Sequence, residues 1–153
     1  MTVSDDELRD LVHRSCLFLD DSDWDAYLGL CTEDFTYRIT AFSPELRKNM
    51  VWLEQDCAGM TNLFENLENH VTLKGRFLRH VNVALIECDE EHGVGQAIST
   101  FFVIHTGLDG VSTMFAAGRY NDTIDISGNR PLLHTREVTL DTRDLGGGTH
   151  FPI

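Results

Sequence analysis

The sequence lacks the features that mark a secreted or membrane-spanning protein. Its first ten residues contain no basic stretch followed by an apolar core, so we expect no signal peptide. No apolar run approaches the roughly 18 residues that cross a membrane. The four cysteines include no C-x-x-C pair; they are Cys16, Cys31, Cys57 and Cys88. We therefore expect reduced, mostly buried thiols in a cytoplasmic protein.

Basic residues are also scarce, since 12 Lys and Arg stand against 25 Asp and Glu and the net charge is −13. Such a surface repels both nucleic acid phosphates and anionic membranes, so we expect neither as a partner. The sequence has no G-x-S-x-G turn and no glycine-rich phosphate loop ahead of a helix. Its seven histidines show no H-x-H, H-x-x-x-H or H-E-x-x-H spacing. We therefore expect no metal ion and no cofactor in this chain.

Apolar periodicity divides the chain into a mostly helical first part and a second part made of strands. Helical spacing, opened by a capping box of Ser4 and Glu7, predicts helices at about 5–20, 23–32 and 57–69. Alternating apolar residues predict a strand at 35–40, and we favour a further short strand at 48–54. From Arg76 onward a period of two predicts long strands at about 76–88, 95–106, 111–126 and 132–141, with an extended tail at 142–153.

This order of elements predicts one domain, residues 1–153, of the α+β class, because the helices are segregated from an antiparallel meander. Strands longer than ten residues must twist and bend. We therefore expect a long, curved sheet that wraps around the N-terminal helices as a cone-shaped roll. Gly118, in the middle of a predicted strand, is a candidate site for a bend.

The predicted long strands carry apolar side chains on both faces, which an antiparallel sheet with one solvated face does not need. In the first long strand we expect one face to pack on the helices; it contains Phe77, Val81, Val83 and Leu85. The other face then points outward with Leu78, His80, Asn82, Ala84 and Ile86. A surface that mixes apolar and hydrogen-bonding groups is typical of a protein interface, so we expect a partner chain.

A cone can also enclose a titratable group whose pKa moves toward neutrality on burial. The groups that could serve are Asp34, Tyr37, His80, His105 and Tyr120, although strand parity points His80 outward. An alternative function is therefore a free-standing cone enzyme that uses Asp34, Tyr37 or His105 in an acid–base pocket. A third alternative is a dimerising binding module without chemistry.

Local patterns along nearly the whole chain carry a family resemblance. They comprise Leu19-Asp20-Asp21, Trp24, Tyr27 and Leu28, Asp34 ahead of Tyr37, the stretch 76–83, the stretch 136–141, and Phe151. Together they resemble the small (β) subunits of Rieske non-haem iron oxygenases of the ring-hydroxylating type. The chain lacks a proline that this family often carries after the first strand, and the entry to its first long strand is spaced differently. These departures suggest an outlying branch that acts on a non-aromatic substrate, such as the methanesulfonate monooxygenase branch.

The resemblance implies a cystatin-like, nuclear-transport-factor-2-like cone with a structural, non-catalytic role. Because the wider superfamily also contains isomerases and dehydratases, it implies that the alternative, a free-standing enzyme, would be an isomerase or a dehydratase. It also implies a larger α subunit that carries a Rieske 2Fe-2S cluster and a mononuclear iron, and self-association as a trimer within a three-plus-three hexamer. This chain has no C-x-H followed by C-x-x-H, so it cannot supply the two Cys and two His ligands of a Rieske cluster by itself.

Subunit contacts are predicted from residue type, because Trp and Arg are enriched among interface anchors. The expected outward face of the first long strand adds a histidine and an asparagine. The predicted interface residues are Trp52, Arg76, Arg79, His80, Asn82, Arg119 and Arg136.

Overall fold

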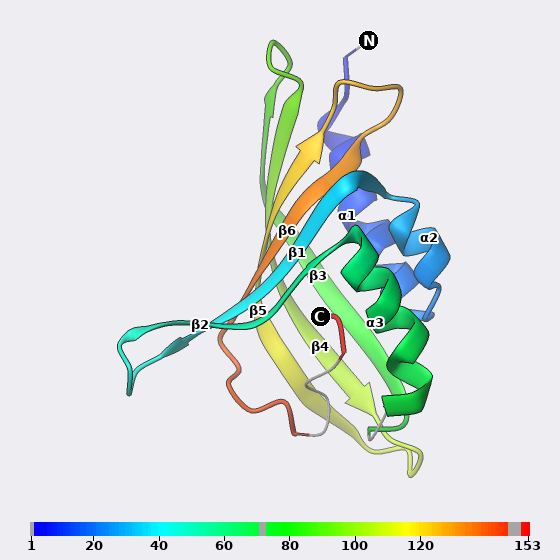
Figure 1. Cartoon of the computed structure of the whole chain (residues 1–153), viewed down its shortest axis with the longest axis vertical. Coiled ribbons are helices and arrows are strands. Elements are labelled where there is room, and N and C mark those ends of the chain that lie inside the picture. Colours follow the sequence, from blue (N-terminus) through cyan, green and yellow to red (C-terminus); the bar gives the residue numbers. More distant parts are fainter. Residues whose placement is uncertain (1, 71–72, 147–150) are drawn as a thin grey trace.

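The computed structural model describes residues 2–70, 73–146 and 151–153, and its helices pack on one side of a strongly curved sheet (Figure 1). The helices are α1 (Asp5–Asp20), α2 (Trp24–Leu28) and α3 (Cys57–His70). The strands are β1 (Cys31–Ser43), β2 (Lys48–Asp56), β3 (Arg76–Asp89), β4 (Val94–Thr106), β5 (Ser112–Asp125) and β6 (Leu132–Leu140). None of the helices in these ranges is both long and apolar enough to cross a membrane. The predicted α+β cone is confirmed.

The strand order of the sheet is β2-β1-β6-β5-β4-β3, so the first strand of the sequence lies next to the last one. β1 and β6 run parallel, with Tyr37 opposite Arg136, and all other neighbours are antiparallel. Register shifts interrupt the antiparallel pairings, for example between Val103 and Ile104. Such bulges bend strands and increase their twist, which lets the sheet curve around the helices.

The first helix forms where the capping signal predicts it. The Ser4 hydroxyl accepts a hydrogen bond from the Glu7 amide at 3.3 Å, and the Glu7 carboxylate accepts one from the Ser4 amide at 2.8 Å. The helical stripe is buried against the sheet and consists of Leu8, Leu11, Val12, Cys16 and Leu19. One face of α1 therefore covers the inside of the cone.

The second helix is shorter than predicted, so the expectation of a helix over 23–32 is wrong for its second half. Asp23 caps it by accepting from the Ala26 amide at 3.2 Å, but the helix ends at Leu28. The carbonyl of Leu30 then accepts a hydrogen bond from the Leu133 amide at 2.8 Å. This long-range bond to the β6 strand draws the chain into the sheet, and local spacing does not reveal it.

The long strands match their predicted boundaries within one residue, but the faces of β3 change along its length. Phe101 and Val103 of β4 are buried while Phe102 is exposed, and His80 of β3 points outward as predicted. A register shift between Val83 and Leu85 reverses the alternation, so Leu85 is exposed rather than packed on the helices. A bulge adds one residue to a strand and turns every later side chain to the other face.

Candidate functional site

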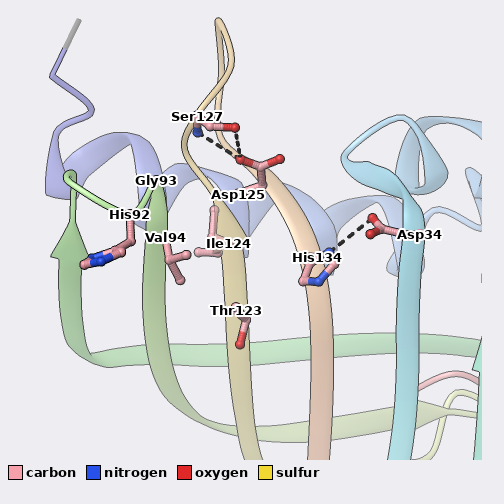
Figure 2. A pocket seen from close by; sticks show the side chains of 9 residues that line it. All are labelled: Asp34, His92, Gly93, Val94, Thr123, Ile124, Asp125, Ser127 and His134. Carbon is pink, nitrogen blue, oxygen red and sulfur yellow. Dashed lines mark hydrogen bonds and ion pairs between the residues drawn. The ribbon is translucent and has the colours of Figure 1, made fainter.

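An open pocket of about 240 Å³ lies at one end of the sheet (Figure 2). Four strands and the turns beside them line it with Asp34, His92, Gly93, Val94, Thr123, Ile124, Asp125, Ser127 and His134. His134 Nδ1 lies 3.2 Å from Asp34 Oδ1 and 3.3 Å from the Thr32 hydroxyl. The pocket thus places an imidazole beside a carboxylate at the surface.

The carboxylate of this pocket suits electrostatic contact better than acid–base chemistry. The hydrogen bond from Thr32, together with the charge and the hydrogen bond of His134, holds the pKa of Asp34 below its ordinary value. Asp34 is exposed to water, and the slight desolvation that would raise its pKa is outweighed by these contacts, so the carboxylate is not brought toward neutrality. Within the described ranges, no group of three or more His, Cys, Asp or Glu side chains could hold a metal ion.

Tyr37 lies in the core and anchors the end of the chain. Its hydroxyl donates to the Ile153 carbonyl at 3.1 Å and accepts from the Ile153 amide at 2.7 Å. Burial raises the pKa of Tyr37 to about 12, so the phenol stays protonated near neutral pH. The residue therefore holds structure together rather than acting as a base.

Replacing Tyr37 with phenylalanine should lower the free energy of unfolding by about 1–3 kcal/mol, because two buried backbone groups of Ile153 lose their partner. Urea denaturation followed by circular dichroism measures this change. Tyr120→Phe is the matched control, since the buried Tyr120 hydroxyl has no hydrogen-bond partner among the described residues. Equal losses in both variants would contradict the assigned role.

His105 is also used structurally. Its Nε2–H donates to the Lys74 carbonyl at 2.8 Å, and its ring packs 5.0 Å from that of Phe77. The histidine thereby fixes the segment that enters the β3 strand. The three candidate acid–base residues therefore do not share a pocket. Asp34 lines the open pocket, Tyr37 lies at the buried end of the chain, and His105 lies at the entry to β3.

The interior of the cone contains two ion pairs that sequence reasoning did not foresee. Arg136 donates to both carboxylate oxygens of Asp122 at 2.8 and 2.9 Å, and neither side chain is exposed. Its guanidinium also lies 4.3 Å from the ring centroid of Tyr120. Arg79 donates to Asp20 and to the Pro152 carbonyl, each at 2.7 Å.

The interface predictions for Arg79 and Arg136 are therefore not supported, because both side chains are enclosed by their own chain. The alternation of side chains along the strands predicts that both arginines face inward, which residue type alone does not reveal. Arg79 falls in phase with the inward-facing Phe77 and Val81, and Arg136 falls in phase with Val138. Residue type favours an exposed interface position for these arginines, whereas their positions in the strands place them on the buried face.

The other predicted interface residues do lie at the surface. His80 stacks on Phe102 with ring centroids 4.9 Å apart, and together with Asn82 they line a shallow hollow of about 220 Å³ on the outer face. Arg76 and Arg119 are exposed, and so is Trp52. Part of the outer face therefore mixes apolar and hydrogen-bonding groups as predicted, and its use as an interface stays a prediction.

Known proteins place this architecture in a family. Residues 3–130 match the SnoaL-like domain. The β subunit of the methanesulfonate monooxygenase hydroxylase of Methylosulfonomonas methylovora is 31% identical, over 97% of this chain and 86% of that protein. The 2-aminobenzenesulfonate 2,3-dioxygenase subunit β of Alcaligenes sp is 30% identical, over 95% and 97% respectively. The chain belongs to the SnoaL-like oxygenase β subunits.

Solved structures agree with this oxygenase β-subunit fold. A crystal structure described as the β subunit of an aromatic-ring-hydroxylating dioxygenase from Novosphingobium aromaticivorans superposes with a TM-score of 0.83, at 21% identity over 97% of this chain and 95% of that one. The benzoate 1,2-dioxygenase β subunit of Burkholderia mallei gives 0.71, at 17% identity over 92% and 93%. These two structures show the fold, and the two relatives of about one-third identity confirm the resemblance to oxygenase β subunits, with a methanesulfonate monooxygenase subunit among them.

Proposed function

We propose that this β subunit is a structural component of a multicomponent Rieske-type oxygenase. Its partner is a larger α subunit that carries the Rieske 2Fe-2S cluster and the mononuclear iron. The observation that carries the proposal is the identity of about one third, along nearly the whole chain, with the β subunits of two oxygenases. The separate structural uses of Tyr37 and His105 support a role in assembly rather than in chemistry.

Isolation of the tagged chain from its native host tests the proposal. We expect a larger protein to be retained with it, and the complex to show the visible absorption of an iron–sulfur cluster. The chain purified alone should be colourless. A colourless preparation that contains this chain and no larger subunit would count against the proposal.

We further propose that three copies associate within a three-plus-three hexamer. The outer surface of the sheet supports self-association, because Leu78, Phe102 and Met114 expose large apolar side chains there. Light scattering of the purified chain at micromolar concentration should give a mass well above the monomer's 17.3 kDa. A monomeric mass would contradict this part of the proposal.

We also propose that the whole complex acts on a sulfonate, which depends on the oxygenase assembly proposed above. Both curated relatives take their names from sulfonates, one aliphatic and one aromatic. Oxygen consumption by the isolated complex, supplied with its electron-transfer partners, should respond to methanesulfonate or 2-aminobenzenesulfonate more than to benzoate. A response to benzoate alone would point to an aromatic carboxylate instead.

A further inference from the structure

A hairpin arm, residues 42–52, projects from the body of the molecule (Figure 1, cyan, beside the β2 label). It is the outer part of the β1–β2 hairpin, with a turn at 44–47. Two of its side chains are more than half exposed, Phe42 at 52% and Leu46 at 58%. Met50, Val51 and Trp52 are exposed as well. A two-stranded hairpin gives such side chains little cover, so this arm offers apolar surface for a contact.

The arm is held in shape by polar contacts at its turn. The Leu46 amide donates to the Ser43 hydroxyl at 3.3 Å. Arg143, which follows the β6 strand, donates to both carboxylate oxygens of Glu45 at 3.1 Å. The arm is therefore tied to the body in one orientation, and a partner can meet a preformed surface.

The charge of the arm is opposite to that of the whole molecule. Arg47 and Lys48 stand next to one another at the tip, and neither forms an ion pair within the described part of the chain. The acid in the turn, Glu45, is already engaged by Arg143. A basic, apolar projection thus extends from a protein with a net charge of −13.

A complementary surface lies elsewhere on the same chain, at an acidic end formed by the β3–β4 turn and the start of α1. Four carboxylates lie at the end of β3 and in this turn, Glu87, Asp89, Glu90 and Glu91, and of these Asp89 is paired with His92. The start of α1 lies beside this turn, because the Leu8 side chain packs against Gly95 of β4, and its first turn adds the carboxylates of Asp5, Asp6 and Glu7. Leu85 and Val94 expose apolar surface beside these carboxylates.

The arm and the acidic end therefore match in both apolar and charged character. They point in different directions from the body, so one molecule cannot satisfy its own arm (Figure 1). A contact between two different patches of identical chains is heterologous, and it closes into a ring when the rotation between copies allows. Opposite charges at the rim of such a contact steer association and fix its register.

We propose that the hairpin arm of one copy docks on the acidic end of the next copy, and that this head-to-tail contact builds the β-subunit ring. The inference rests on the self-association proposed above. A second copy is the occupant that the structure supports, because this chain itself carries the surface of complementary charge.

Charge exchange within the full-length chain tests the contact. The arm variant R47E/K48E and the acceptor variant E90K/E91K each place like charges at the interface. In either variant the dissociation constant for self-association should rise about 100-fold, as measured by mass against dilution. The combined variant R47E/K48E/E90K/E91K carries both charges reversed, so it should associate as the wild type does. Thermal unfolding shows that each variant is folded.

The outcomes separate this inference from the proposals on which it rests. If the wild type is monomeric, self-association itself fails. If the wild type associates and both two-site variants keep its affinity, or if the combined variant stays dissociated, docking of the arm is overturned while self-association stands. Loss of the larger subunit from the arm variant, with unchanged self-association, would assign the arm to that subunit and also overturn the inference.

Discussion

Replacing Asp122 with alanine should lower the free energy of unfolding by about 3–5 kcal/mol, which is the usual cost of leaving a buried charge without its partner. Arg136 would be that charge. Only 1% of the residue is exposed, its Nε and Nη2 atoms bond only Asp122, and its Nη1 atom has no hydrogen-bond partner among the described residues. No route to water is open to the guanidinium without rearrangement of the core.

Arg136 cannot escape the loss by giving up its proton. Burial alone would lower the pKa of Arg136, but the charge and hydrogen bonds of Asp122, together with the nearby Tyr27 and Tyr120, outweigh burial and hold the pKa well above its ordinary value. Even without that carboxylate, the guanidinium of an arginine stays charged in proteins. The Asp122→Ala core would therefore contain an uncompensated cation between β5 and β6.

Urea denaturation compares this loss with that of a surface pair. Glu45→Ala breaks the exposed pair with Arg143 and should change stability by less than about 1 kcal/mol. The double variant Asp122→Leu, Arg136→Met removes both charges and should recover much of the lost stability. Similar effects for Asp122→Ala and Glu45→Ala would show that the interior pair is not isolated from water.

Gly118→Ala should destabilise the fold by about 3 kcal/mol, at the upper end of what overpacking usually costs. A methyl group there would collide with the carbonyl oxygen of Thr139 and lie 3.0 Å from the Cα of Leu140. Both atoms belong to the backbone of β6, which lies next to β5 in the sheet, so they cannot turn aside as a side chain could. The strands would have to separate where the sheet is most central.

Gly128→Ala is the matched control for this strand position. It lies in the turn before β6, and a methyl group there meets no atom within 4 Å. Its effect on the midpoint of urea denaturation should be small, whereas Gly118→Ala should shift that midpoint strongly downward. Equal shifts of the midpoint in the two variants would mean that the close approach of β5 and β6 is not the reason that position 118 requires a glycine.

Most of the fold could be predicted from the sequence because its signals are local. The capping box starts α1 at the predicted residue, and the period of two yields the long strands. The predictions fail where contacts between segments distant in the sequence determine the local structure. Leu30 leaves the predicted helix because it bonds to Leu133 in β6, and Leu85 changes face because β4 pairs with β3 through a bulge.

The candidate site was less predictable, because it depends on which side chains meet. His134 was not among the predicted residues, although it pairs with the predicted Asp34. These residues lie on strands that are distant in sequence and neighbours in the sheet. Tyr37 could be predicted to face inward, but not to bond the backbone of Ile153. Such partners follow from tertiary packing, which apolar periodicity does not encode.

Turnover of the isolated oxygenase complex, measured per larger subunit, tests most directly whether this chain supports assembly without chemistry. Complexes that contain Asp34→Asn, Tyr37→Phe or His105→Gln in the β subunit should retain the turnover of the wild type when their subunit content is equal. A general acid or base contributes about 100- to 10,000-fold to a rate. A loss of that size in any one of these fully assembled complexes would contradict the account.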